Sequence, residues 1–175
     1  MSLIRMVAQM DTTLVLIDFL LKKYAAEKKA TMYVIEQLSD EDLMWAPAQG
    51  SNSIANLVAH IRGTVHQRIE TVFLDVPDSR DRDKEFESGL QLSKEQALKL
   101  IADSFDRIIE VLKQASERPG LLLERPYADL PPLTNSGVDN QATVLEILLH
   151  QFRHLPAHTG QIVYIAKMRK GSIQW

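Results

Sequence analysis

The sequence of 175 residues contains no cysteine. This absence excludes structural disulfides, thiolate zinc sites, iron–sulfur clusters and a cysteine nucleophile. Any metal ion must therefore be held by histidine, carboxylate or water. The absence of a disulfide framework fits a reducing compartment, and we expect a cytoplasmic protein.

Strong charge and long apolar runs are also missing. With 20 Lys and Arg against 23 Asp and Glu, the formal net charge is −3, too small to favour nucleic acid or an anionic membrane as a partner. No stretch approaches the roughly 18–20 uninterrupted apolar residues of a membrane span. The first residues lack the charged and apolar regions of a signal peptide. We therefore expect no nucleic acid and no membrane among the partners.

Strand-like alternation and internal repeats are absent as well, whereas helical periodicity recurs along the chain. Asp11 or Thr12 can cap the first helix, and Ser39 can open a short turn that Pro47 ends. We predict an all-α fold in which residues 1–175 form a single four-helix-bundle domain. The predicted helices span residues 11–39, 51–75, 93–116 and 143–170.

Two long connections separate the later helices. Residues 76–92 are charged, and residues 117–141 contain prolines and glycines that argue against a helix. Loops longer than about 12–15 residues are uncommon and often functional. Their lengths leave both neighbouring and crossover packing of the helices open. We interpret Asp83 and Glu85 in the first connection as solvated charges, with a cover over a site as the alternative.

The last predicted helix carries three of the five histidines, at His150, His154 and His158. Each step of four residues drifts by about 40° around a helix, so the three imidazoles point in different directions. His158 lies nearest the apolar face, His154 lies at its flank, and His150 points almost away from it. Neighbours in the series are about 6 Å apart along the axis and can share one metal ion, whereas the outer two are about 12 Å apart.

A catalytic metal site commonly takes three protein ligands, so a third ligand must come from another helix. The candidate is His60, at the edge of an apolar stripe and beside the small or polar residues Ser53, Asn56 and Gly63. The alternative is that the paired histidines only form hydrogen bonds at the flank of the bundle. We expect His66 to be solvated.

Pro156 and Gly160 break the rules of helix formation within the same two turns. A proline inside a helix removes a hydrogen bond and kinks the helix, at a cost of about 3 kcal/mol. A glycine costs up to about 1 kcal/mol relative to alanine. Such conflicts beside clustered imidazoles are typical of a functional site. We predict a kink that re-aims one imidazole; the alternatives are a tolerated kink and close helix packing at Gly160.

The segments "NSIANLVAHIRG" (52–63) and "HLPAHTGQIVYIAK" (154–167) resemble the DinB-like (YfiT-like) superfamily, and within it a bacterial branch. The resemblance covers nearly the whole chain. It implies a four-helix bundle, often dimeric, that holds a divalent metal through three histidines. By match of motif these are His60, His154 and His158. A proline between the paired histidines departs from the family pattern.

The resemblance further implies a metal-dependent thiol S-transferase and a homodimer. Because a metal ion can also make hydroxide available from bound water, a hydrolase that acts on a small electrophilic substrate is expected as well. An all-nitrogen site suits zinc and also nickel, iron or copper; we expect zinc or nickel, and a low-molecular-weight thiol is a further expected cofactor. A non-catalytic metal- or ligand-binding bundle related to stress is the alternative, and a pure interaction protein is a third. The candidates for a catalytic role are Asn56, Glu146 and His150, although Glu146 is also placed to cap a helix.

Overall fold

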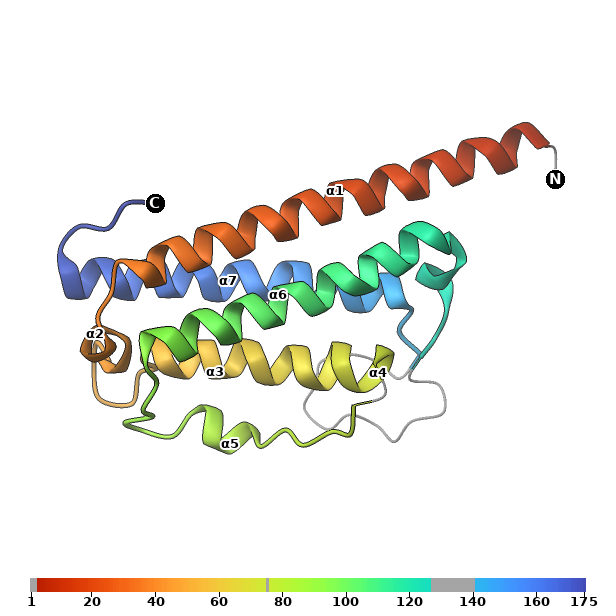
Figure 1. Cartoon of the computed structure of the whole chain (residues 1–175). Coiled ribbons are helices and arrows are strands. Elements are labelled where there is room, and N and C mark those ends of the chain that lie inside the picture. The colour runs from red at the N-terminus through yellow and green to blue at the C-terminus, as the bar shows by residue number, and fades with distance from the viewer. Residues whose placement is uncertain (1–2, 75, 127–140) are drawn as a thin grey trace.

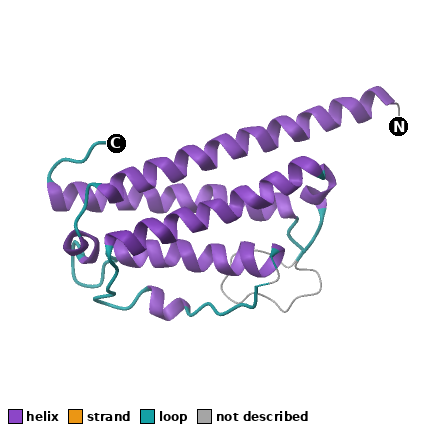
Figure 2. Cartoon of the chain, viewed as in Figure 1, coloured by secondary structure: helices purple, strands orange, loops and turns teal. Residues whose placement is uncertain are grey.

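The computed structural model describes residues 3–74, 76–126 and 141–175. Throughout these residues the chain forms helices and loops and no strand (Figure 2). The predicted all-α class is therefore confirmed. No helix in the described part of the chain combines the length and the apolar character that crossing a bilayer requires.

Four long helices form the bundle (Figure 1). Two of them, α1 (Leu3–Glu36) and α3 (Ile54–Val65), each pack against both α6 (Lys94–Glu117) and α7 (Val144–Lys170). It follows that α1 and α3 stand at opposite corners of the bundle. In Figure 1, α3 and α6 run in one direction, and α1 and α7 run in the other.

This arrangement explains the path of the long connection after α3. Because α3 and α6 are neighbours that run the same way, the chain must return along the length of the bundle between them (Figure 1). It returns through residues 76–92, which we call the strap. The strap contains a short helix, α5 (Arg82–Glu85), that packs against α3 and that the charged sequence did not predict. By contrast, α6 and α7 stand at opposite corners of the bundle and run in opposite directions (Figure 1).

Capping boxes begin α2 (Asp40–Met44), α3, α6 and α7. In each box the hydroxyl of the first residue accepts a hydrogen bond from the backbone N–H of the residue three positions later. The side chain of that later residue in turn accepts a hydrogen bond from the backbone N–H of the first. Such a cap contributes about 1 kcal/mol of helix stability. The predicted end of the short turn before Pro47 is confirmed. The predicted stop of α7 at Gly171 is also confirmed, and this residue has the positive φ of 77° that glycine adopts readily. The boxes pair Ser39 with Asp42, Ser53 with Asn56, Ser93 with Gln96, and Thr143 with Glu146.

The start of the first helix differs from the prediction. Since α1 already begins at Leu3, the cap expected at Asp11 or Thr12 is wrong. The preceding residues include leucine, methionine, alanine and arginine, which favour helix and extend it backwards.

Two other segments also differ. The second long helix begins at Ile54 rather than at residue 51 and closes with a π-helix, His66–Glu70, followed by α4 (Thr71–Phe73). The connection after α6 contains a short 3-10 helix, Pro119–Leu123, because proline suits the first position of a helix. Residues 127–140 of that connection lie outside the described residues.

The core takes buried side chains from all four long helices. Tyr24 lies at the centre, with its ring edge-on to Phe105 and Phe152 at centroid distances of 6.4 and 5.8 Å. Its hydroxyl donates to the carbonyl of Leu148 at 2.7 Å, which ties α1 to the first half of α7.

The last helix passes through Pro156 without a break. Beyond the proline, a second polar link joins α7 to α1, where the hydroxyls of Thr31 and Thr159 lie 2.9 Å apart in the core. Tertiary contacts therefore hold α7 on both sides of Pro156. The kink that we expect at this residue stays a prediction.

Candidate metal centre

His60 on α3 and His154 and His158 on α7 meet at one point between the two helices. The Nε2 atom of His154 lies 3.3 Å from Nε2 of His60 and 3.0 Å from Nε2 of His158. One ring nitrogen from each of the three histidines lies within 4.8 Å of the others. A zinc ion bound tetrahedrally at about 2.0–2.1 Å separates its nitrogen ligands by about 3.3 Å. The three imidazoles are therefore close enough to hold a metal ion.

The secondary structure produces this convergence. The spacing of four residues puts His154 and His158 on neighbouring turns of α7, and their rings are perpendicular at a centroid distance of 4.4 Å. His60 enters from α3, which begins at the Ser53–Asn56 capping box and packs against α7. His150 lies outside this cluster.

Hydrogen bonds at the far side of two rings determine which nitrogen carries the proton. Nδ1 of His60 lies 2.8 Å from Oε2 of Glu85, and Nδ1 of His158 lies 2.7 Å from Oε1 of Gln161. Both oxygens are acceptors, so each Nδ1 donates and each Nε2 presents a lone pair to the centre. Nδ1 of His154 is buried and has no hydrogen-bond partner among the described residues. Lone pairs that converge in this way suit a cation.

Burial keeps the paired histidines in the form that binds metal. It lowers the pKa of His154 to about 3, with a further contribution from the charges of His158 and His60. Burial also lowers the pKa of His158, although the hydrogen bond to Gln161 opposes the change. Both imidazoles are neutral near pH 7, and a neutral imidazole is the ligand that a metal ion requires.

Glu85 in the strap is the carboxylate that completes the surroundings of His60. It is 6% exposed and accepts hydrogen bonds from Nε and Nη2 of Arg80 at 2.7 and 2.9 Å, as well as from His60. Burial alone would raise the pKa of Glu85, but the bonds and charges of Arg80 and His60 outweigh it and lower the pKa. The interpretation of Glu85 as a solvated charge is therefore wrong. Asp83, two residues before Glu85 on the same short helix, is exposed as expected.

Asn56 and Gly63 on α3 fix the strap over the centre. The side-chain amide of Asn56 donates to the carbonyls of Glu85 and Glu87, both at 2.9 Å, while its oxygen accepts from the backbone of Ser53. A Cβ atom at Gly63 would lie 1.8 Å from Oε1 of Glu85, so only glycine leaves room for this carboxylate. Asn56, a candidate for a catalytic role, thus orients the strap that carries Glu85.

The other two candidates lie outside the trio. His150, which the helical drift pointed almost away from the apolar face, is half-buried, and its ring stacks on that of His154 at a centroid distance of 5.9 Å. Glu146 is exposed, and its carboxylate accepts from the backbone N–H and the hydroxyl of Thr143. The structure therefore places Glu146 in a helix cap and His150 as a packing partner of one ring of the centre.

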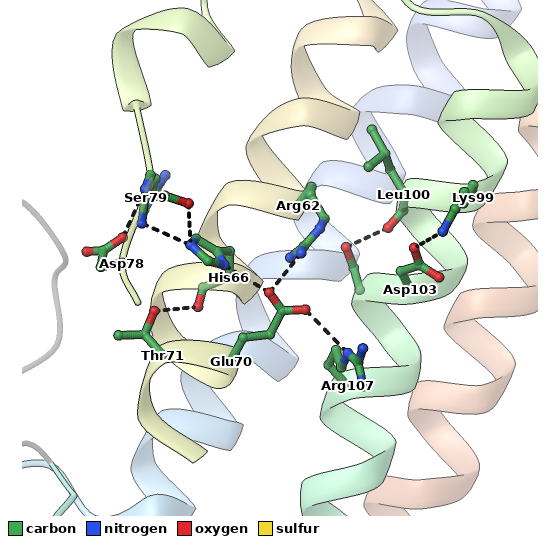
Figure 3. Close-up of polar contacts among 12 residues, drawn as sticks. Arg62, His66, Glu70, Thr71, Asp78, Ser79, Lys99, Leu100, Asp103 and Arg107 are labelled. Atoms are coloured by element: carbon green, nitrogen blue, oxygen red, sulfur yellow. Dashed lines mark hydrogen bonds and ion pairs between the residues drawn. The ribbon is translucent and has the colours of Figure 1, made fainter. Parts of the chain in front are cut away.

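His66 anchors the start of the strap, and the prediction that it is solvated is wrong (Figure 3). Its Nε2 accepts from the backbone N–H of Ser79 at 3.1 Å, so its Nδ1 donates to Glu70 at 2.9 Å. The buried Glu70 also pairs with Arg62 and Arg107. The spacing of four between His66 and Glu70 is a signal that sequence analysis can use. The π-helix that frames this network is of a kind found frequently at functional sites.

The fold and the centre together define a helical-bundle protein with three histidines that can hold a metal ion. A profile of the DinB superfamily matches residues 24–162, and the chain belongs to this superfamily. The family resemblance that the motifs indicated is thereby confirmed.

The crystal structure of a conserved protein from Enterococcus faecalis is similar in fold, with a TM-score of 0.61. The two sequences are 14% identical, and the match covers 89% of this chain and 97% of that one. At this identity the likeness concerns the fold alone. No curated protein matches the chain.

Proposed function

We propose that the chain is a metal-dependent enzyme in which His60, His154 and His158 hold a zinc or nickel ion. The observation that carries the proposal is the convergence of three Nε2 atoms, two of which are held as lone-pair donors by Glu85 and Gln161. A bound ion of this kind lowers the pKa of a water or a thiol in its open position. The reaction would then be attack by hydroxide or thiolate on a small electrophile.

The residues of the chain favour the thiol reaction. As ligands the three imidazoles contribute no negative charge, so the charge of the ion stays available to lower the pKa of a bound thiol or water. Hydrolysis of an ester or amide also requires a proton for the leaving group. The carboxylate nearest the histidines, Glu85, is occupied by His60 and Arg80 and is therefore badly placed to supply one. We infer thiol S-transfer as the first activity to test and hydrolysis as the second.

Metal analysis of tag-free protein tests the centre. We expect about one zinc or nickel per chain in the wild type and none in His60→Ala or His154→Ala. His150→Gln is the matched control, because it removes an imidazole from the same helix and leaves the trio intact. Metal content near zero in the wild type, or content that His60→Ala does not change, would contradict the proposal.

Because the carboxylate of Glu85 is already bound to His60 and Arg80, a second candidate is a bundle that binds metal without catalysis. A panel of small electrophiles, assayed with and without low-molecular-weight thiols on metal-loaded protein, separates the two. Conjugation or hydrolysis that is lost in His154→Ala supports the enzyme. Tight metal binding with no turnover across the panel supports the non-catalytic bundle.

A further inference from the structure

A groove runs beside the three-histidine centre, between residues 47–52 and the face of α7 that carries Gly160 and Tyr164. Its volume is about 710 Å³, within the range of about 300–1,000 Å³ typical of small-molecule sites. All of its lining residues are described, and none of them is charged. Two large apolar side chains at the groove, Tyr164 and Met168, are 68% and 50% exposed. The groove therefore suits an uncharged and largely apolar molecule.

Gly160 explains why the groove is open. This residue lies inside α7, where glycine is unfavourable, and an added Cβ atom would meet nothing within 4 Å. Close helix packing, the alternative considered for this glycine, is therefore wrong. Because Gly160 lines the groove and has no side chain, it takes up none of the space of the groove.

Gln161 connects the groove to the centre. It lines the groove, and its Oε1 accepts the hydrogen bond from Nδ1 of His158. Two further lining residues are neighbours of the trio in the sequence: Leu57 lies one turn before His60 on α3, and Ala157 directly precedes His158 on α7. A molecule in the groove would therefore contact Gln161, which orients His158, and residues next to His60 and His158 on their helices.

We propose that this groove binds the uncharged, apolar part of the small-molecule substrate whose reactive group is treated at the three-histidine centre. This assignment of a substrate class rests on the proposed function. The absence of charge in the lining excludes recognition of an ionic group there, because a charge moved out of water needs a partner. The polar group of the substrate would have to lie towards the histidines.

Binding of N-phenyl-1-naphthylamine, a neutral apolar fluorophore, tests the groove on the full-length chain with and without zinc. We expect saturable binding that Gly160→Leu weakens at least tenfold, because the leucine fills part of the groove. Gly160→Ala is the matched control and should change the affinity by no more than about twofold. Tyr164→Ala, which removes an exposed wall and leaves the core intact, should also weaken binding. An anionic analogue, 8-anilinonaphthalene-1-sulfonate, should bind less well than the neutral probe.

The connection between the groove and the three-histidine centre is tested by a separate measurement, the absorption spectrum of bound cobalt. Addition of the neutral probe to cobalt-loaded protein should shift the visible absorption bands of the ion through Gln161 and His158, and the shift should be absent in Gly160→Leu. Unchanged probe affinity in a folded Gly160→Leu variant and in Tyr164→Ala would overturn the proposal that the groove is the binding site. A cobalt spectrum that the probe leaves unchanged would overturn its connection to the centre.

These outcomes are separable from the failure of the proposed function. Probe binding that survives in a protein that takes up no metal would remove the enzyme proposal and keep the groove as an apolar binding site. A stable dimer by light scattering that excludes the probe would instead show that a second copy of the chain covers the groove, and would overturn the proposal.

Discussion

Replacement of Glu85 by glutamine should weaken metal binding without removing any metal ligand. In the wild type the carboxylate of Glu85 accepts the Nδ1 proton of His60 at 2.8 Å and two hydrogen bonds from Arg80. Glutamine has nearly the same shape but no charge, and its amide nitrogen cannot accept. The substitution therefore leaves the ligand in place. It leaves a single oxygen for which Nδ1 of His60 and the guanidinium of Arg80 compete, and it removes the charge that raises the basicity of Nε2 of His60.

The expected magnitudes differ for metal affinity and for stability. Loss of such a partner typically reduces metal affinity by about 10–100-fold, which corresponds to about 1.4–2.8 kcal/mol of binding free energy. The folded state should also lose about 3 kcal/mol, because the side chain of Arg80 is only 6% exposed and keeps a charge without a counterion. The double variant Glu85→Gln/Arg80→Met removes both charges. It should regain most of the stability and none of the affinity.

Competition with a chromophoric chelator at pH 7.5 measures zinc affinity, and urea unfolding measures stability. Asp83→Asn is the matched control, because it removes an exposed charge from the same short helix, α5, and should change neither quantity. Zinc affinity within twofold of wild type in both Glu85→Gln and the double variant would refute the argument that Glu85 orients His60. Recovery of affinity in the double variant would show that stability alone governs binding.

Three further predictions follow from the same contacts. Gly63→Ala should push the carboxylate of Glu85 away and reduce zinc affinity by a similar 10–100-fold without changing any charge, as chelator competition would show; unaltered affinity would mean that the carboxylate is not needed where it lies. Metal-free protein should lose stability as the pH falls from 6.5 to 5. The pKa of His154 in the folded state lies below the value of 6.5 in the unfolded chain. The unfolded chain therefore binds more protons than the folded protein in this range, which favours unfolding. Solvent around the half-buried ring screens the effect to about 1 kcal/mol at pH 5, and urea unfolding of His154→Asn should show a smaller slope. Gly160→Ala should raise the melting temperature by about 2–4 °C, because alanine is favoured by up to about 1 kcal/mol in a helix and its Cβ meets no atom; a lower melting temperature would contradict that account.

The sequence predicts those parts of the site that depend on residues close together in the chain. The spacing of His154 and His158, and the position of His60 at the edge of an apolar stripe, depend only on helical geometry. Capping pairs such as Ser93 with Gln96 are local in the same sense. Because an amphipathic helix must bury its apolar face, the stripes also bring α3 and α7 together and, with them, the three imidazoles.

The position of the strap could not be predicted from local sequence patterns. Residues 78–87 are mostly charged or polar, a composition that usually belongs to a solvated loop. The position of Glu85 depends instead on the parallel course of α3 and α6, which sends the strap along α3, and on contacts with Asn56 and Gly63 far away in the sequence. No periodicity encodes these contacts. The π-helix that positions His66 is likewise a small change in helical hydrogen bonding that the sequence does not mark.

Pro156 and Gly160, the two residues of α7 that disfavour a helix, have different physical explanations. Gly160 faces open space, so its effect is on the shape of the surface beside the centre. Pro156 lies in an unbroken helix that two links to α1 hold in place, at Tyr24 before it and at Thr31 beyond it. Because those contacts offset the missing backbone hydrogen bond, the proline can stand between His154 and His158 while their Nε2 atoms remain 3.0 Å apart. The register of the histidine pair is therefore maintained by the packing of α7 on α1 as well as by the helix itself.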